Sequence, residues 1–391
     1  MKSLHKIYFK NSKNLKELND SSIDLVVTSP PYPMIEMWDR IFSQNNSKIR
    51  GYLEDGLGFK AFELMHIELD KVWAEIYRVL KNGGIACINI GDATRKIGGS
   101  FQLFPNHSRI LQNCISLGFS VLPEIIWQKQ SNKPNKFMGS GMLPPNAYIT
   151  QEHEYILILR KGEIRNFTDE EKQIRSKSTY FWEERNIWFS DLWSDIKGID
   201  QEIKDRDTRA RSAAFPLDLA YRLINMFSIH GDTILDPFLG TGTTILASMA
   251  SNRNAVGYEI DKNFKPLIHA RLEDILKISN NKILERIKNH LNYIRVREKN
   301  GKSVKYFSEN YKCKVITKQE VNIQFYFLKS MQKLDKDENT IEVYYHKSYP
   351  LKTIIGQINA RFNQKIFYEK EEMQAETENK MIQKKLFSDK I

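Results

Sequence analysis

Short apolar runs alternate with amphipathic stretches through the first 160 residues. Residues 23–27 form a mostly apolar, β-branched run, which is typical of a strand buried on both faces of a parallel sheet. Residues 60–80 place apolar side chains at helical spacing, and Asn82-Gly83-Gly84 predicts the end of that helix. A further strand is expected from Ile85 to Ile90. These signals predict consecutive strand–helix units in a parallel sheet.

A second set of such units follows residue 211. We expect a helix from about Phe215 to Ser228, with Pro216 in its first turn, and then a strand at residues 233–236. A glycine-threonine loop, a helix of small residues and a strand from Ala255 come next. The chain therefore predicts an α/β fold with a mostly parallel, doubly wound sheet and a smaller basic C-terminal region.

Between the two sets, residues 163–211 are polar and charged, yet they contain Trp182, Trp188, Phe189 and Trp193. Aromatic side chains among basic ones can stack on nucleic-acid bases. In a mostly polar stretch they are more often anchors that dock onto the main core. We interpret this stretch as a linker and leave a substrate-facing role open.

Composition narrows the class of protein. No run in the 391 residues approaches the about 18 apolar residues that a membrane span needs. The first residues are too polar for a secretory signal, so we expect a cytoplasmic protein. Cys87, Cys114 and Cys313 form no CxxC pair, and we predict neither a disulfide framework nor a metal site.

The first segment with a chemical signature is Ser29-Pro30-Pro31-Tyr32, directly after the strand at residues 23–27. Two adjacent prolines cannot donate backbone hydrogen bonds and fix their own φ, so the strand must give way to a stiff loop. In open α/β sheets, ligands bind at the carboxyl ends of the strands. We therefore expect this loop to face a ligand.

The second signature is the loop at residues 236–244, between a strand and a helix. Its glycines let the backbone approach a ligand closely, and the helix start offers unpaired N–H groups. It lacks the Gly-Lys-Ser/Thr of a phosphate-binding P-loop. Glu259 follows 23 residues after Asp236, at the tip of the next strand, where it can accept hydrogen bonds from ribose hydroxyls. The pair indicates an adenosine-containing cofactor without identifying it.

Together these two segments resemble the motifs of the DNA amino-methyltransferases of restriction-modification systems, in the permuted order with the catalytic motif first. The resemblance covers about residues 5–275 and implies a Rossmann-like methyltransferase fold. It implies S-adenosylmethionine as cofactor, double-stranded DNA as substrate and functional pairing with a restriction endonuclease. In this family SPPY is the usual variant of cytosine-N4 enzymes, whereas adenine enzymes more often carry Asp at position 29. Ser29 therefore favours cytosine N4.

The resemblance also assigns roles to individual residues. The catalytic set is Ser29, Pro30, Pro31 and Tyr32, and the cofactor-binding set is Asp236, Phe238, Gly240, Gly242, Thr243, Glu259, Phe215 and Pro216. Asp92, at another strand tip, and Trp38 and Asp39, after the catalytic loop, are secondary candidates.

The chemistry expected of the catalytic set is direct attack by an exocyclic amine. Its lone pair is delocalised into the ring until acceptors such as Ser29 Oγ and the Pro30 carbonyl localise it. The base must leave the duplex, and Tyr32 offers a ring on which it can stack. The carbon-5 methyltransferases need a cysteine nucleophile, typically after proline, and none of the three cysteines follows one.

We divide the chain into a catalytic half at residues 1–162, a linker and recognition segment at 163–211, a cofactor-binding half at 212–278, and a basic region at 279–391. The net charge of +11 comes mainly from residues 281–391, which hold 23 Lys and Arg against 14 Asp and Glu. Positive charge suits a phosphate backbone, so we expect this region, with Tyr344, Tyr345 and Tyr349, to share base recognition with the linker. A packing or oligomerisation role is the alternative.

Two other functions remain open. One is adenine-N6 methylation by the same fold, and the other is a non-catalytic nucleic-acid-binding protein with a methyltransferase-like fold. The target sequence and the oligomeric state are not predicted.

Overall fold

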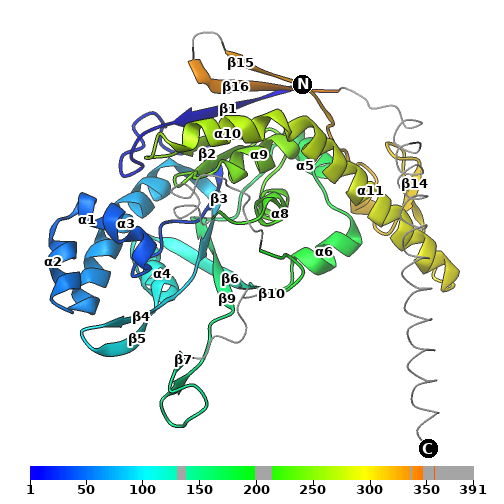
Figure 1. The fold of residues 1–391 in the computed structure, drawn as a ribbon. Helices are drawn as coiled ribbons and strands as arrows, with labels where there is room; N and C mark the ends of the chain where they lie inside the picture. Colours follow the sequence, from blue (N-terminus) through cyan, green and yellow to red (C-terminus); the bar gives the residue numbers. More distant parts are fainter. Residues whose placement is uncertain (130–137, 199–213, 335–336, 347–355, 357–391) are drawn as a thin grey trace, which may run out of the picture.

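A computed structural model of the chain describes residues 1–129, 138–198, 214–334, 337–346 and 356 (Figure 1). A ten-stranded sheet with the order β10-β6-β9-β3-β2-β11-β12-β1-β16-β15 runs through its centre. Its strands are β1 (Lys2–Tyr8), β2 (Ile23–Thr28), β3 (Leu80–Ile90), β6 (Phe119–Gln128), β9 (His153–Lys161), β10 (Leu192–Trp193), β11 (Thr233–Asp236), β12 (Asn254–Tyr258), β15 (Leu328–Leu334) and β16 (Asp337–Tyr345).

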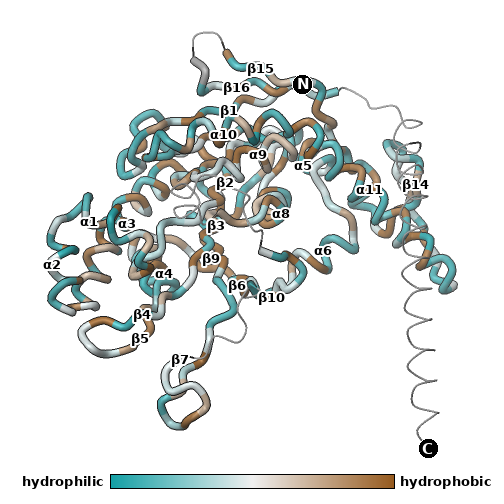
Figure 2. Tube along the Cα trace, viewed as in Figure 1, coloured by the Kyte–Doolittle hydropathy of each residue, from teal (hydrophilic) through white to brown (hydrophobic). Residues whose placement is uncertain are grey.

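Five neighbouring strands, β3, β2, β11, β12 and β1, are mutually parallel. Strand β2 is buried along its whole length, and successive side chains enter different cores: Leu25 and Val27 belong to one, Val26 to the other. A strand covered on both faces has no polar face, which explains its nearly continuous apolar run. Figure 2 shows apolar residues around β2 and β9, at the centre of the body. The predicted mostly parallel α/β fold is confirmed.

Helices cover both faces of the sheet. One face is covered by α1 (Asp39–Asn45), α2 (Lys48–Glu54), α3 (Gly58–Val79) and α4 (Asn106–Ser116), and the other by α8 (Leu217–Phe227), α9 (Thr243–Ala250), α10 (Phe264–Glu273) and the start of α11 (Ile275–Lys299). The helices predicted at residues 60–80 and 215–228 are α3 and α8. Pro216 is the residue before α8 rather than part of its first turn.

The expectation of uninterrupted strand–helix units through residue 160 was wrong at one point. Strand β9 lies between β3 and β6 and is antiparallel to both. Antiparallel neighbours need no crossover helix, so an apolar run followed by a second one does not by itself indicate a parallel pair. The connection from β6 to β9 includes the hairpin of β7 (Met138–Gly139) and β8 (Ala147–Tyr148), which projects from the body in Figure 1. A second hairpin, of β4 (Ala93–Ile97) and β5 (Ser100–Phe104), follows β3 and also projects from the body.

The stretch expected to be a linker has regular structure in its described part. It contains α5 (Asp169–Lys177), α6 (Trp182–Trp188) and β10, which pairs with β6. Trp193 is fully buried, and its indole donates a hydrogen bond of 3.1 Å to the carbonyl of Trp188, itself buried. These tryptophans are therefore anchors on the core, as their surroundings suggested. Residues 199–211 of this segment lie outside the described residues.

The basic C-terminal region is joined to the same sheet, because β16 pairs with β1 and β15 with β16. Tyr345 is buried, and its hydroxyl lies 2.8 Å from both Ser3 Oγ and the Met249 carbonyl oxygen, so its expected role in reading bases was wrong. Tyr344 donates to Glu342, and Tyr349 lies outside the described residues. The region also holds β13 (Tyr306–Ser308), β14 (Cys313–Val315) and the short helix η2 (Lys318–Glu320).

Within the described ranges, no helix has both the length and the apolar character needed to cross a membrane.

Candidate active site

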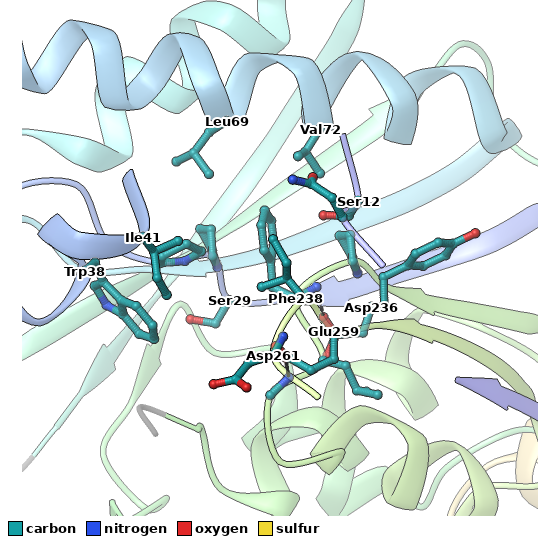
Figure 3. A pocket seen from close by; sticks show the side chains of 18 of the residues that line it. Ser12, Ser29, Trp38, Ile41, Leu69, Val72, Asp236, Phe238, Glu259 and Asp261 are labelled. Carbon is teal, nitrogen blue, oxygen red and sulfur yellow. Dashed lines mark hydrogen bonds between the residues drawn. The ribbon is translucent and has the colours of Figure 1, made fainter. Parts of the chain in front are cut away.

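The carboxyl ends of β2, β11 and β12 meet at one edge of the sheet because the three strands are parallel neighbours. The loops that follow them line a single pocket, which encloses about 1160 Å³ together with its open mouth. Figure 3 looks into it: Leu69 and Val72 of α3 lie on one side, Glu259 and Asp261 on the other, and Ser29 and Phe238 between them. The two sequence segments with chemical signatures therefore share one site.

Most of the predicted site residues line this pocket: Ser29, Pro30, Pro31, Phe215, Asp236, Phe238, Gly240, Thr243 and Glu259. The other three are neighbours of lining residues. Tyr32 has its hydroxyl 3.2 Å from Ser29 Oγ, Pro216 precedes α8, and Gly242 is the residue before α9.

Asp236 joins the two halves of the site. Its Oδ1 accepts a hydrogen bond of 2.6 Å from the Thr28 hydroxyl and one of 3.1 Å from the Phe238 amide, and its Oδ2 accepts one of 2.6 Å from Thr244. Burial raises the pKa of Asp236 to about 6, although the three donors oppose the shift. The carboxylate thus holds β2, the loop after β11 and α9 in fixed positions.

Glu259 holds the cofactor loop from the neighbouring strand. Its two carboxylate oxygens accept hydrogen bonds of 2.7 Å from the Gly240 amide and 2.8 Å from the Asp261 amide. Burial, with the negative charges of Asp261 and Asp236, raises the pKa of Glu259 to about 7. Each carboxylate oxygen can accept a further hydrogen bond, and Glu259 lines the pocket, so it can also receive ribose hydroxyls.

The turn between β11 and α9 needs its glycines. Gly240 and Gly242 have φ of +52° and +83°, a conformation that L side chains rarely adopt. Arg271 of α10 fixes the turn from behind, since its Nη1 donates to the Thr241 carbonyl at 2.8 Å and to the Thr243 hydroxyl at 3.0 Å. Arg271 lies far along the chain from this loop, and sequence reasoning missed it.

The catalytic loop is held by residues from two other strands. The Ser29 hydroxyl lies 3.2 Å from the Tyr32 hydroxyl, which in turn lies 2.9 Å from Glu154 Oε2 at the start of β9. Asn89 of β3 donates to both Tyr32 at 2.9 Å and Glu154 at 2.7 Å. Burial and the nearby Glu154 raise the pKa of Tyr32 well above its ordinary value, so the phenol stays protonated at neutral pH.

Of the three secondary candidates, Trp38, Asp39 and Asp92, only Trp38 is a lining residue of the pocket. Asp39 forms an ion pair of 2.8 Å with Arg95. Asp92 accepts hydrogen bonds from the backbone and ring of His107 and lies outside the pocket lining. Sequence reasoning missed the loop after β1, at residues 10–13, and the apolar wall formed by Ile41, Leu69 and Val72. The first could have been found from β1, which is parallel to β2, β11 and β12 and ends at the same edge.

Comparisons with known proteins agree with this site. The family model described as DNA methylase matches residues 23–270. The Type II methyltransferase M.MthZI of Methanothermobacter thermautotrophicus is 55% identical over 363 residues, which cover 92% of this chain and 100% of that protein. The Type II methyltransferase M.MjaI of Methanocaldococcus jannaschii is 52% identical, over 68% of this chain and 91% of that protein.

Among solved structures, a DNA modification methylase from Thermus thermophilus, complexed with S-adenosyl-L-methionine, superposes with a TM-score of 0.54. It is 34% identical, over 69% of this chain and 95% of that chain.

The pocket suits the same cofactor, because acceptors for a ribose lie beside apolar and aromatic walls and a glycine turn at a helix start. The chain belongs to the DNA methylase family, the S-adenosylmethionine-dependent amino-methyltransferases of DNA.

Proposed function

We propose that this protein transfers a methyl group from S-adenosylmethionine to the N4 amino group of cytosine in duplex DNA. The observation that carries the proposal is that Ser29 lines the same pocket as Gly240 and Glu259. The SPPY form of the catalytic loop favours cytosine over adenine. Adenine N6 is the alternative, since the same acceptors would serve its amino group.

The catalytic loop supplies acceptors at the place where positive charge develops. As the amine nitrogen attacks, Ser29 Oγ and the Pro30 carbonyl localise its lone pair and stabilise the charge on its hydrogens. The two prolines keep both acceptors in position, which lowers the cost of reorganisation. The bound cofactor supplies an electrophilic methyl group on a sulfonium. The residues that would hold the cofactor are Glu259 at its ribose and Phe238 at its adenine.

No covalent enzyme–base bond is needed. Cys87 and Cys114 are buried, and burial raises the pKa of both thiols far above the range in which a thiolate forms. All three cysteines, including Cys313, lie outside the pocket lining. Direct attack by the amine is therefore the route that the side chains support.

Access to the pocket requires a base that has left the duplex, and we propose Tyr32 as its stacking partner. The ring packs closely on the backbone of Gly91, where a Cβ would lie 3.0 Å from Tyr32 Cε2. A ring held from behind and through its hydroxyl loses little freedom when a base stacks on it.

We further propose that the protein protects DNA alongside a restriction endonuclease, as the resemblance of its motifs to the methyltransferases of restriction-modification systems implies. Two of its relatives are named Type II methyltransferases, which supports this proposal. Residues 1–162 would carry catalysis and residues 212–278 the cofactor. Sequence recognition would come from residues 163–211 and from exposed basic side chains of residues 279–391, since Trp188, Trp193 and Tyr345 are buried.

The test is to incubate the protein with methyl-labelled S-adenosylmethionine and plasmid DNA, digest the DNA to nucleosides and identify the labelled one by mass. N4-methylcytosine is the expected product. Labelled N6-methyladenine would assign the alternative, and unlabelled DNA from a protein that binds cofactor and DNA would favour a non-catalytic role.

A further inference from the structure

The Tyr32 hydroxyl lies at the centre of a network that reaches from the pocket to β9. It is 3.2 Å from Ser29 Oγ, 2.9 Å from Asn89 Nδ2 and 2.9 Å from Glu154 Oε2. Glu154 is largely buried, and its other oxygen forms an ion pair of 2.9 Å with Lys129, whose side chain is 48% exposed. A phenol, a hydroxyl, an amide and a carboxylate are thus connected in one chain.

The chemistry of these groups fixes the direction of every hydrogen bond. An ionised carboxylate can only accept, so Tyr32 donates its single proton to Glu154. The phenol oxygen then accepts from the Asn89 amide nitrogen, which can only donate, and from Ser29. The only proton of the Ser29 hydroxyl is therefore engaged in this hydrogen bond to Tyr32. Towards the pocket, the Ser29 oxygen can act only as a hydrogen-bond acceptor.

We propose that Glu154 is a positioning residue that sets the hydrogen-bond direction of Tyr32 and Ser29, so that Ser29 meets the target amino group as an acceptor. Without this constraint the Tyr32 proton could turn towards Ser29, and the Ser29 proton could turn into the pocket. There it would bind the nitrogen lone pair that must attack the methyl group. This role rests on methyl transfer to an amino group of DNA and applies equally to cytosine N4 and adenine N6.

Two substitutions at this position separate hydrogen-bond direction from charge. Glu154→Leu removes the acceptor, and we expect kcat to fall by about 10-fold or more with the DNA dissociation constant nearly unchanged. Glu154→Gln removes the charge but keeps an oxygen that can accept from Tyr32, with its NH2 turned towards Lys129, which can swing into solvent. We expect Glu154→Gln to retain kcat within about 3-fold.

Tyr32→Phe tests whether the effect passes through the phenol. This variant removes the group that takes the Ser29 proton, so kcat should fall, and adding Glu154→Leu or Glu154→Gln should then cause no further loss. Glu152→Leu, an exposed glutamate two residues away, is the matched control and should leave kcat unchanged. Urea unfolding of each variant reports whether it folds. If Glu154→Leu does not fold, the comparison of Tyr32→Phe, which should lower kcat, with Glu154→Gln, which should retain it, still tests the proposal.

Equal losses in Glu154→Gln and Glu154→Leu would assign the effect to charge and overturn the proposal. Independent, multiplicative losses from Glu154→Leu and Tyr32→Phe would also overturn it, as would a fully active Glu154→Leu. A wild-type protein that methylates no DNA would instead contradict the proposed function itself, and this role with it.

Discussion

The Thr28 hydroxyl donates a 2.6 Å hydrogen bond to Asp236 Oδ1 and so joins two strand ends that are 208 positions apart in the chain. Thr28 directly precedes the catalytic loop, and Asp236 opens the cofactor loop. One buried hydrogen bond therefore fixes the spacing between the two functional segments.

Removing that hydroxyl should destabilise the protein in a pH-dependent way. Thr28→Val leaves the shape nearly unchanged, and we expect a loss of about 1–3 kcal/mol in the free energy of unfolding. Because burial raises the pKa of Asp236 to about 6, its contribution to stability is fully present below its ordinary pKa of 3.8 and is lost as pH rises through about 6. The ionised carboxylate needs the hydroxyl more, so the cost of Thr28→Val should be larger at pH 7.5 than at pH 5. Urea unfolding at both pH values measures it, and equal costs would contradict the account.

Cofactor affinity should depend on pH through Glu259. Its pKa is raised to about 7, so in the ligand-free protein its contribution to stability is fully present below about pH 4.5 and is lost as pH rises through about 7. Ribose hydroxyls bind the ionised form better, and cofactor affinity should therefore increase over the same range. Calorimetric titration at pH 6 to 8.5 should show this increase in the wild type but not in Glu259→Gln, whose affinity at pH 8 should be about 10-fold lower. Using the variant as the reference removes any titration of the cofactor itself, so identical slopes would refute this role.

Alanine substitutions at Gly242 and at a reference glycine, Gly231, should separate the cost of a left-handed backbone from the cost of side-chain crowding. Gly242 and Gly231 have nearly equal φ values of +83° and +84°, but a Cβ at Gly242 would lie 3.2 Å from Ile268 Cγ2, whereas one at Gly231 would meet nothing within 4 Å. Gly231→Ala should cost about 1–2 kcal/mol for the left-handed backbone alone. Gly242→Ala should cost about 1 kcal/mol more and weaken cofactor binding. Equal unfolding costs in urea would show that the helix start is not crowded.

Ser29 should act on turnover rather than on DNA binding. Ser29→Ala removes an acceptor that meets developing charge, so we expect kcat to fall about 100-fold while the DNA dissociation constant changes less than about 2-fold. Ser116→Ala, whose hydroxyl bonds only to carbonyls of its own helix among the described residues, is the matched control. Steady-state methylation and filter binding measure the two quantities. Parallel losses in both would indicate that Ser29 serves binding.

The features that could be predicted from the sequence are those that depend on a short run of consecutive residues. The apolar run ending at Thr28, the two prolines and the glycine turn after Asp236 each carry a local signal, and parallel pairing brings the strand tips together. The sequence did not separate the roles of the neighbouring residues Phe215 and Pro216. In the structure Phe215 lines the pocket, whereas Pro216 is the residue before α8.

The supports of the site could not be predicted in this way. Glu154 reaches Tyr32 across 122 positions, and it does so because β9 enters the sheet antiparallel to β3, a choice that the apolar pattern of β9 does not specify. Arg271 likewise reaches the cofactor turn from a helix whose sequence gives no sign of that contact.

The central claim is that one pocket holds both the methyl donor and the extruded base. The most direct measurement is a crystal structure of the protein with a non-reactive cofactor analogue and a short duplex that contains its target. We expect the target amino nitrogen within about 3 Å of Ser29 Oγ and the Pro30 carbonyl oxygen, with the ribose of the analogue on Glu259. An analogue bound at another face, or a target base that remains stacked in the duplex, would contradict the claim.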